Sequence, residues 1–332
     1  MATVEDIVHE SGVSRSTVFR FLNGSNVRSE AKKSIIEAME KLNFRSETLK
    51  RQNNYNIEIS ISDNYEGFKG FADVVQGILQ RADEMCISVN LCRRMGDDIT
   101  SYYSRWNVKE SNKGVIIVGK EILDEEEEVL MLLSKKIPHV FVNRIFEAEG
   151  VSWVSVDIEK AALEAVEHLI SLGHKKIAVV GQQGRLRIDR NKVKGLKDAM
   201  EKHGIPIDER YIREVLKEED FNDMVKEVLT IKDRPTAFFA ICDSHAMKIM
   251  HIARNLGIRL PEELAVIGMD NVDTSEYSRP TLSTVHIPFK KMGILAVDNI
   301  IQLISDPEVS NIRTIVSHKL VIRDSSGSKP SF

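Results

Sequence analysis

Four polar side chains near the start of the chain have the types and the spacing of a surface that reads DNA. Arg15, Ser16, Thr17 and Arg20 fall on one face of a predicted helix. An arginine can donate two hydrogen bonds to a guanine in the major groove, whereas hydroxyls and further arginines grip the phosphate backbone. Because Arg15 and Ser16 open the helix, we expect these two side chains to reach base edges.

Capping signals on either side of a glycine predict the two helices that would hold this surface. Thr3 and Asp6 resemble a capping box, with aspartate in place of the usual glutamate or glutamine. Gly12 permits a sharp turn, and Ser14 is the predicted N-cap of the second helix. Two short helices around such a turn are typical of a helix-turn-helix.

A third predicted helix completes a small N-terminal module. Ser29 is its expected N-cap, and its apolar stripe consists of Ile35, Ile36, Met39 and Leu42. A plain amphipathic bundle would explain the apolar stripes, but it would not explain a cap, a glycine and a second cap in this order. The side chains expected to fix the module on the DNA backbone are Thr3, Ser14, Thr17, Arg20, Asn23 and Ser29.

Charge is distributed unevenly along the 332 residues. The net charge is −4, yet residues 1–53 carry nine Lys and Arg against seven Asp and Glu, and the remainder carries 37 against 43. A mildly basic module on an acidic body favours local contact with DNA and little non-specific binding elsewhere.

The cysteines and the hydropathy indicate the compartment. Cys86, Cys92 and Cys242 are odd in number and lack the spacing of metal ligands, so we expect them to be reduced. No apolar run is long enough to span a membrane, and no signal segment opens the chain. We therefore expect a cytoplasmic protein that does not contact membranes.

From residue 57 onward, predicted strands and helices alternate, after a polar connector at 43–56. Helices of roughly 10–15 residues between short β-branched strands predict parallel sheets that are covered on both faces. The units are too many for one sheet. We therefore expect an α/β core made of two doubly wound parallel-sheet subdomains.

Polar residues follow several of these strands at the carboxyl end, where such folds bind ligands. Asp63, the pair Asn143 and Arg144, Asp243 and Asp270 each come after an apolar strand. Converging carboxylates would accept hydrogen bonds from the hydroxyls or amines of a ligand. A single carboxylate in this place is as commonly a helix cap, and for Asp243 both interpretations stay open.

Sequence patterns of enzymes are missing. The chain has no nucleophile elbow, no phosphate loop with Gly-Lys-Ser/Thr and no His-Glu-x-x-His. His168 and His174 lie on a predicted helix and beyond its Gly-terminated end, so one helix face cannot present both to a metal. Packing or capping explains both, and we expect neither an enzyme nor a metal or cofactor.

Several motifs, spread over nearly the whole chain, resemble those of the lac/gal repressor (LacI/GalR) family. The N-terminal module carries Thr3-Val-Glu-Asp-Ile, Gly12-Val-Ser-Arg-Ser-Thr-Val18 and Leu22-Asn-Gly24. The later motifs are His168-Leu-Ile-Ser-Leu-Gly-His-Lys-Lys-Ile-Ala178, Gly268-Met-Asp270, Arg279-Pro-Thr-Leu-Ser-Thr-Val285 and Leu320-Val-Ile-Arg-Asp-Ser325.

The resemblance implies a core similar to periplasmic sugar-binding proteins, dimerisation through that core and an effector held between two lobes. It also implies that the chain crosses between the lobes more than once. The expected divisions are a DNA-binding headpiece at 1–46, a hinge at 47–56, a core at 57–325 and a flexible tail at 326–332. Within the core, the expected N-lobe comprises about 57–157 and 286–312, and the expected C-lobe comprises about 158–285 and 313–325.

The predicted hinge departs from the family's pattern. The family's connector contains Tyr-Arg-Pro-Asn and ends in a leucine that wedges into the minor groove and kinks the DNA. Here Ser46 and Asn53 stand in this segment, and an amide cannot fill the apolar gap between bases. Leu49 remains as an apolar hinge contact. We therefore expect weaker kinking than is usual for the family.

The predicted effector site also departs from that pattern. Lys192 stands where the family commonly has an arginine, and Cys242 stands where it usually has an asparagine. A lysine offers a point charge and cannot reproduce the planar fork of a guanidinium. The candidate effector contacts are Asp63, Phe71, Asn143, Arg144, Lys192, Asp243 and Asp270.

Together these features predict a ligand-responsive transcriptional regulator, in the commoner mode a repressor. It would bind a pseudo-palindromic operator as a homodimer and a small molecule, a sugar before other classes, between its lobes. The alternative is a cytoplasmic small-solute sensor with weak or unusual DNA binding. The sequence leaves open the effector, the operator and the sign of regulation, and it favours a dimer over a tetramer because no heptad-bearing tail follows the core.

Overall fold

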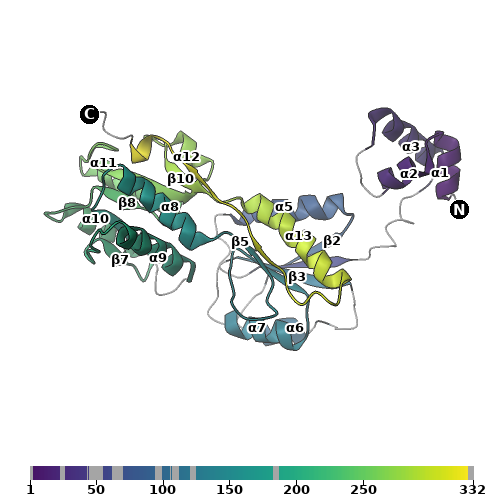
Figure 1. The fold of residues 1–332 in the computed structure, drawn as a ribbon, viewed down its shortest axis with the longest axis horizontal. Helices are drawn as coiled ribbons and strands as arrows, with labels where there is room; N and C mark the ends of the chain where they lie inside the picture. Colours follow the sequence, from purple (N-terminus) through teal and green to yellow (C-terminus); the bar gives the residue numbers. More distant parts are fainter. Residues whose placement is uncertain are drawn as a thin grey trace.

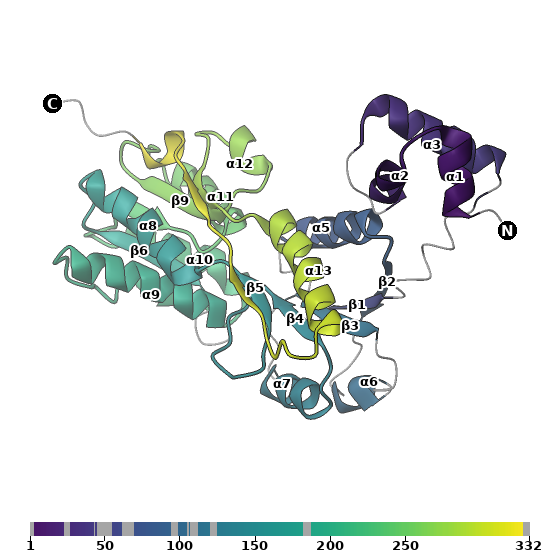
Figure 2. The same cartoon turned by 45° about the vertical axis from the view of Figure 1, so that its right-hand side comes forward.

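The computed structural model has three parts, a small helical headpiece and two lobes that each contain a six-stranded sheet (Figures 1 and 2). In both views the first lobe lies between the headpiece and the second lobe. Within the part of the chain that the structure describes, no helix is long and apolar enough to cross a membrane. The described residues are 3–22, 27–42, 44, 55–61, 70–93, 99–104, 106, 112–119, 125–181 and 187–327.

Local capping shapes the headpiece. Its helices are α1 (Val4–Ser11), α2 (Arg15–Leu22) and α3 (Ser29–Lys41). The predicted capping box is confirmed, because the Asp6 N–H donates to the Thr3 hydroxyl at 3.3 Å and the Thr3 N–H donates to Asp6 Oδ2 at 2.7 Å. Gly12 ends α1 with a φ of 65°, so the predicted turn is confirmed as well.

Two expectations about α3 are wrong. Its N-cap residue is Arg28, whose side chain makes no capping bond, and Ser29 is the first helical residue. Ile36 is 38% exposed, whereas Ala38 is buried, because Ala38 follows Ile35 by three residues on the inner face. The buried core of the headpiece consists of Ile7, Val18, Ile35, Ala38 and Phe44.

The first lobe is a parallel sheet with α5 and α13 on one face and α6 and α7 on the other (Figure 1). Its strand order is β11-β5-β4-β3-β1-β2. Its elements are β1 (Asn56–Ile61), α5 (Phe71–Glu84), β2 (Ser88–Arg93), α6 (Ile99–Ser104), β3 (Lys113–Val118), α7 (Glu125–Ser134), β4 (His139–Val142), β5 (Trp153–Ser155), α13 (Phe289–Ser305) and β11 (Arg313–Ile315).

Two glycines allow α5 and α13 to pack in direct backbone contact. A Cβ atom on Gly77 would lie 2.1 Å from the Lys290 carbonyl oxygen, and one on Gly293 would lie 2.1 Å from the Val74 carbonyl oxygen. Any larger residue would therefore push the helices apart. This contact fixes the late helix α13 to the first lobe.

The second lobe repeats the architecture with the strand order β12-β10-β9-β8-β6-β7, in which only β12 runs antiparallel to its neighbour. Its elements are α8 (Ile158–Ser171), β6 (Ile177–Gly181), α9 (Arg187–Lys202), β7 (Ile212–Glu214), η2 (Glu218–Asp220), α10 (Phe221–Thr230), β8 (Ala237–Phe239), α11 (Asp243–Asn255), β9 (Ala265–Asp270), α12 (Thr274–Tyr277), β10 (Ser283–His286), β12 (Lys319–Val321) and η3 (Asp324–Ser326).

The chain crosses between the lobes after β5, after β10 and after β11. The last crossing lies later than the sequence predicted, because β11 pairs in parallel with β5. Residues 313–315 therefore belong to the first lobe and not to the second. With that correction, the predicted headpiece and core of two parallel-sheet subdomains are confirmed.

Candidate nucleic-acid interface and ligand site

The α2 helix presents a row of polar side chains to solvent. Arg15, Ser16 and Arg20 are exposed and Thr17 is half-buried, while the opposite face packs into the headpiece core. Ser14 caps the helix as predicted, because its hydroxyl oxygen accepts a hydrogen bond from the Thr17 N–H at 3.4 Å. The Ser14 and Thr17 hydroxyls also lie 2.8 Å apart.

Arg15 has neighbours within the headpiece. Its Nη2 lies 3.0 Å from Glu5 Oε1, with the two side chains 68% and 65% exposed. Its guanidinium carbon lies 5.6 Å from the centre of the Phe19 ring. An exposed ion pair of this kind contributes about 0–1 kcal/mol. Arg15 can therefore exchange Glu5 for a base or a phosphate at small cost.

The other predicted DNA contacts have different surroundings. Thr3 is exposed, but the capping box engages its hydroxyl and its N–H, and these hydrogen bonds lower the pKa of Asp6. Ser29 is exposed at the start of α3. Outside the described residues lie Asn23, Ser46, Leu49 and Asn53.

Two predicted effector contacts come together in the second lobe. Lys192 on α9 is only 7% exposed, and its Nζ donates to the Ile241 carbonyl oxygen at 2.7 Å. Asp270 ends β9 with a φ of 121°, a strained conformation for a residue other than glycine. Burial raises the pKa of Asp270 well above its usual range, and the charge of Lys192 opposes this rise. The site thus offers the buried ammonium group of Lys192 beside the partly buried carboxyl group of Asp270.

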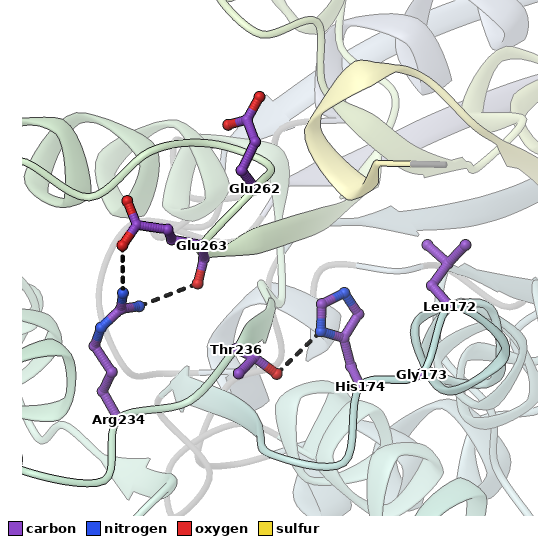
Figure 3. Close-up of a pocket in the computed structure, with 7 residues that line it drawn as sticks. All are labelled: Leu172, Gly173, His174, Arg234, Thr236, Glu262 and Glu263. Carbon is purple, nitrogen blue, oxygen red and sulfur yellow. Dashed lines mark hydrogen bonds and ion pairs between the residues drawn. The ribbon is translucent and has the colours of Figure 1, made fainter. Parts of the chain in front are cut away.

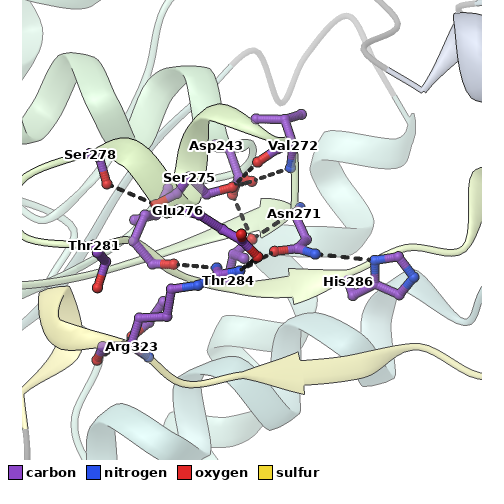
Figure 4. Close-up of polar contacts among 12 residues, drawn as sticks. Asp243, Asn271, Val272, Ser275, Glu276, Ser278, Thr281, Thr284, His286 and Arg323 are labelled. Atoms are coloured by element: carbon purple, nitrogen blue, oxygen red, sulfur yellow. Dashed lines mark hydrogen bonds and ion pairs between the residues drawn. The ribbon is translucent and has the colours of Figure 1, made fainter.

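Asp243 is a structural residue, which corrects its prediction as an effector contact. The side chain is fully buried, and Oδ2 accepts hydrogen bonds from the Val272 N–H at 2.9 Å and the Ser275 hydroxyl at 3.2 Å. Its Oδ1 accepts from the Thr284 hydroxyl at 2.5 Å (Figure 4). The carboxylate ties three segments of the lobe together, and both of its oxygens accept hydrogen bonds from the lobe itself. It is not a helix cap either, since the N-cap residue of α11 is Cys242.

In the first lobe, the predicted contacts lie at the end of β4 and the start of α5. Asn143 has a φ of 63°, and its buried Oδ1 has no hydrogen-bond partner among the described residues. Arg144 is 9% exposed and donates from Nη2 to the Gly119 carbonyl oxygen at 3.1 Å. Phe71 packs against the apolar core, and Asp63 lies outside the described residues.

One contact joins the two lobes near these residues. Arg187, the first residue of α9, places its guanidinium carbon 5.8 Å from the centre of the Phe146 ring. Phe146 follows β4, and its carbonyl oxygen accepts a hydrogen bond from Trp153 Nε1 at 3.1 Å. The helix that carries Lys192 therefore faces the segment that carries Asn143 and Arg144.

Sequence reasoning missed two residues beside this site. His245 is 6% exposed, and its Nε2 lies 3.0 Å from Glu218 Oε1. Hydrogen bonding to His245 lowers the pKa of Glu218 to about 2. The signal in the sequence for His245 was its place three positions after Cys242, which puts it in the first turn of α11 with Cys242 as the N-cap.

The two histidines considered for a metal have hydroxyl partners of their own. His168 Nε2 lies 3.0 Å from the Ser326 hydroxyl, and His174 Nδ1 lies 3.0 Å from the Thr236 hydroxyl. His174 also lines a surface pocket of about 410 Å³ (Figure 3). This pocket lies at the amino ends of β8 and β9, away from the strand ends that hold Lys192 and Asp270. Its lining residues are Leu172, Gly173, His174, Arg234, Thr236, Glu262 and Glu263.

Two family models match the chain. One covers the headpiece, and the other covers most of the second lobe together with α13 and β11 of the first lobe. A model described as a periplasmic binding protein-like domain matches residues 166–326, and one described as bacterial regulatory proteins of the lacI family matches residues 3–47. The chain belongs to the lacI family. Its headpiece helices all fall within the lacI-family match.

Curated relatives of this lacI-family protein cover its whole architecture. It is 28% identical to the probable HTH-type transcriptional repressor ExuR of Bacillus subtilis, over 98% of each chain. It is 27% identical to the HTH-type transcriptional repressor PurR of Photobacterium profundum, again over 98% of each chain. These relatives are transcriptional regulators and not enzymes. This lacI-family protein is accordingly a transcriptional regulator.

Solved structures share its fold. A complex of the transcriptional regulator CelR with cellobiose superposes with a TM-score of 0.72 at 22% identity, covering 98% of this chain and 100% of that one. The lac repressor dimer bound to operator and the anti-inducer ONPF gives a TM-score of 0.68 at 22% identity, over 98% and 99%. Both resemble the headpiece and two-lobed core of this lacI-family regulator.

Proposed function

We propose that this protein is an effector-responsive repressor that binds a pseudo-palindromic operator through α2. The observation that carries the proposal is the exposed row of Arg15, Ser16 and Arg20 on a helix whose other face is buried. A recognition helix in the major groove needs this division between a polar outer face and an apolar inner face. A regulator of this kind works on the chromosome, which is why we keep the expectation of a cytoplasmic location.

The experiment starts by selecting an operator from random duplexes with the full-length protein. Arg15→Ala should lose about 1–3 kcal/mol of discrimination at one base position in each half-site. Arg20→Ala is the matched control, because a phosphate contact should weaken all sequences alike and reduce the salt dependence. If Arg15→Ala weakened every sequence equally, the assignment of Arg15 to a base would be wrong.

The repressor is proposed to act as a homodimer. Leu79 on α5 is 49% exposed, and Leu91 on β2 is 61% exposed, both on the first lobe. Large apolar side chains that are exposed to solvent on adjacent elements favour burial against a second copy of this chain. Light scattering should give a dimer for the parent protein and a monomer for Leu79→Glu/Leu91→Glu. A dimer in both would place the interface elsewhere.

The effector is proposed to be a small polar molecule, with a sugar as the first candidate, held between the lobes. Lys192 and Asp270 on one side and the buried Asn143 Oδ1 on the other give it donors and acceptors to bond. The cellobiose complex of a protein with the same fold supports the class. Isothermal titration against sugars and nucleobases should detect a ligand whose binding weakens at least tenfold in Asp270→Asn. If this substitution left binding of the ligand unchanged, the effector site would have to lie elsewhere in the protein.

The alternative function, a solute sensor without regulatory DNA contact, makes a different prediction. A protein that neutralises several phosphates loses DNA affinity steeply as salt rises. Binding to the selected operator that is weak at low salt and indifferent to salt would support the sensor. The row of exposed arginines on α2 favours the repressor.

A further inference from the structure

Among the described residues, a buried ammonium group in the candidate effector site has no partner of opposite charge. Lys192 is 7% exposed, and its Nζ donates to the Ile241 carbonyl oxygen at 2.7 Å. An ammonium group has several N–H donors, and this carbonyl is the one acceptor among the described residues that bonds to Nζ. Asp189, one turn earlier on α9 and 5% exposed, does not form an ion pair with it. Because a buried charge is costly unless it is paired, an anionic ligand would stabilise Lys192 in this place.

The sheet of the second lobe places this ammonium group beside Asp270. The strands β8 and β9 are parallel neighbours in which Phe239 pairs with Ile267, and the Ala240 N–H donates to the Ile267 carbonyl oxygen at 2.8 Å. The carbonyl group that holds Lys192 follows shortly after the end of β8, and Asp270 is the last residue of β9. Both groups therefore lie at the carboxyl edge of the sheet, where folds of this kind bind ligands.

The carboxyl group of Asp270 is suited to donate a hydrogen bond to a ligand. It forms no ion pair with Lys192 among the described residues. Burial raises the pKa of Asp270 well above its usual range, although the charge of Lys192 opposes this rise. The neighbouring acidic groups Cys242, Asp243 and Asp189 raise the pKa of Asp270 further. A raised pKa favours the protonated carboxyl group, whose O–H donates to an acceptor such as an anion.

The facing lobe offers an acceptor. Asn143 follows β4 with a φ of 63°, and its buried Oδ1 has no hydrogen-bond partner among the described residues. The Arg187 guanidinium carbon lies 5.8 Å from the centre of the Phe146 ring, so the start of α9 adjoins the segment that carries Asn143. A hydroxyl group of a ligand between the lobes can donate to this oxygen. The two sides together match a ligand that has an anion at one end and hydroxyl groups elsewhere.

We propose that the effector is a sugar acid, a polyhydroxylated compound with one carboxylate, and that Lys192 selects it over the corresponding neutral sugar. The inference rests on the proposed function, because it concerns the effector of the same site. A carboxylate accepts charge-assisted hydrogen bonds from the ammonium group of Lys192 and from the Asp270 O–H. A phosphate ester would bring a second negative charge close to Asp189, and an amino sugar would bring a cation close to Lys192.

The first measurement is isothermal titration of the full-length protein with matched ligands. Each neutral sugar is compared with its acid, galactose with galacturonate and glucose with glucuronate and gluconate. We expect one of the acids to bind at least about tenfold more tightly than its neutral partner, because hydrogen bonds to charged groups contribute more than those between neutral groups. Glucosamine and glucose 6-phosphate test the other two charge types. Tightest binding of a neutral sugar, the amino sugar or the phosphate would overturn the proposal, and so would a failure of all the acids to bind.

The second measurement repeats these titrations with substitutions at Lys192. Lys192→Met removes the charge and should abolish the preference for the acid, whereas Lys192→Arg keeps the charge and should keep a preference. Lys194→Met is the matched control with unchanged affinities, because Lys194 is 58% exposed on the same helix and pairs with Glu159 and Asp198. A preference that survived in Lys192→Met, or that was lost equally in Lys194→Met, would overturn the proposal.

The sugar acid and the proposed effector site can fail separately. If a neutral sugar bound as tightly as its acid and Asp270→Asn weakened both, the effector site would stand and the sugar acid would be wrong. If neither Lys192→Met nor Asp270→Asn changed the binding of an acid, both would be wrong. If Lys192→Met did not fold, the comparison of acid with neutral sugar in the parent protein would decide. The operator selection needs no effector, so it is independent of these results.

Discussion

The headpiece and the second lobe place their functional side chains in opposite environments. On α2, Arg15 and Glu5 form an ion pair in which both side chains are about two-thirds exposed. In the second lobe, Lys192 is 7% exposed and Asp243 is fully buried. The polar side chains of the headpiece are held weakly and are ready for a partner, whereas those of the lobe are already part of its interior.

The range of their interactions differs as well. The capping box that starts α1 joins Thr3 to Asp6, three residues away. Asp243 bonds Thr284, 41 positions away, and Lys192 bonds Ile241, 49 positions away. A substitution in the headpiece should therefore act on one helix, while a substitution at Asp243 should act on the whole lobe. The predictions below test this difference.

The largest effect is expected for Asp243→Ala. The substitution leaves the Val272 N–H and the hydroxyls of Ser275 and Thr284 buried without their acceptor, which should cost about 3 kcal/mol or more of the free energy of unfolding. Urea unfolding of the full-length protein measures it. Asp223→Ala is the control, since the Asp223 side chain is 83% exposed, and it should change stability by less than about 0.5 kcal/mol. Similar losses in both variants would refute the structural role of Asp243.

The next effect in size is local. Thr3→Ala removes the hydroxyl that accepts the Asp6 N–H, which should destabilise α1 by about 1 kcal/mol. Hydrogen exchange of the α1 amides should show this loss, while amides of the second lobe keep their protection. Ser29→Ala is the matched control, because Ser29 makes no capping bond and is already helical. Equal effects of the two substitutions would contradict the cap assignment.

The substitutions at Thr3 and Ser29 concern features that differ in how well the sequence predicted them. The Thr3 cap and the Gly12 turn were predicted because each depends on residues a few positions apart. Ser29 was misplaced by one position, since the residue type alone does not fix where a helix begins. The two parallel-sheet lobes followed from the alternation of strands and helices. The pairing of β11 with β5 could not be predicted in this way, because it joins segments about 160 residues apart.

The ligand site was less predictable for the same reason. Asp270 was predicted from its place at a strand end and Lys192 from the resemblance to the LacI/GalR family, and the structure brings them together. The role of Asp243 could not be predicted, because its partners come from β10 and from the segment after β9. Glu218 and His245 escaped notice because 27 residues separate them.

A smaller effect of pH should separate Glu218 from other surface carboxylates. Its hydrogen bond with His245 lowers the pKa of Glu218 to about 2, so the stabilisation is present above its ordinary value of 4.5 and is lost as the pH falls towards 2. Because the side chain is half exposed, Glu218→Gln should cost only about 0.5–1 kcal/mol at pH 6. The difference in Tm between parent and variant should shrink at pH 3. Glu126→Gln, at an exposed position of α7 without a hydrogen-bond or ion-pair partner among the described residues, is the control. A constant difference would mean that the carboxylate charge is not what stabilises the lobe.

The smallest effect on stability is expected at the headpiece surface. Glu5→Gln breaks the ion pair between Glu5 Oε1 and Arg15 Nη2, which lie 3.0 Å apart. Because both side chains are exposed to solvent, the free energy of unfolding should change by less than about 0.5 kcal/mol. DNA affinity should nevertheless rise about twofold to fivefold at low salt, since a negative charge beside the recognition helix disappears and Arg15 no longer has to leave a partner. Fluorescence anisotropy with the selected operator measures the change. Glu37→Gln, which breaks the looser Lys33 pair at 3.9 Å on α3, is the control with unchanged affinity. If Glu5→Gln destabilised the headpiece as much as Thr3→Ala, its surface charges would be structural, and the contrast with the second lobe would fail.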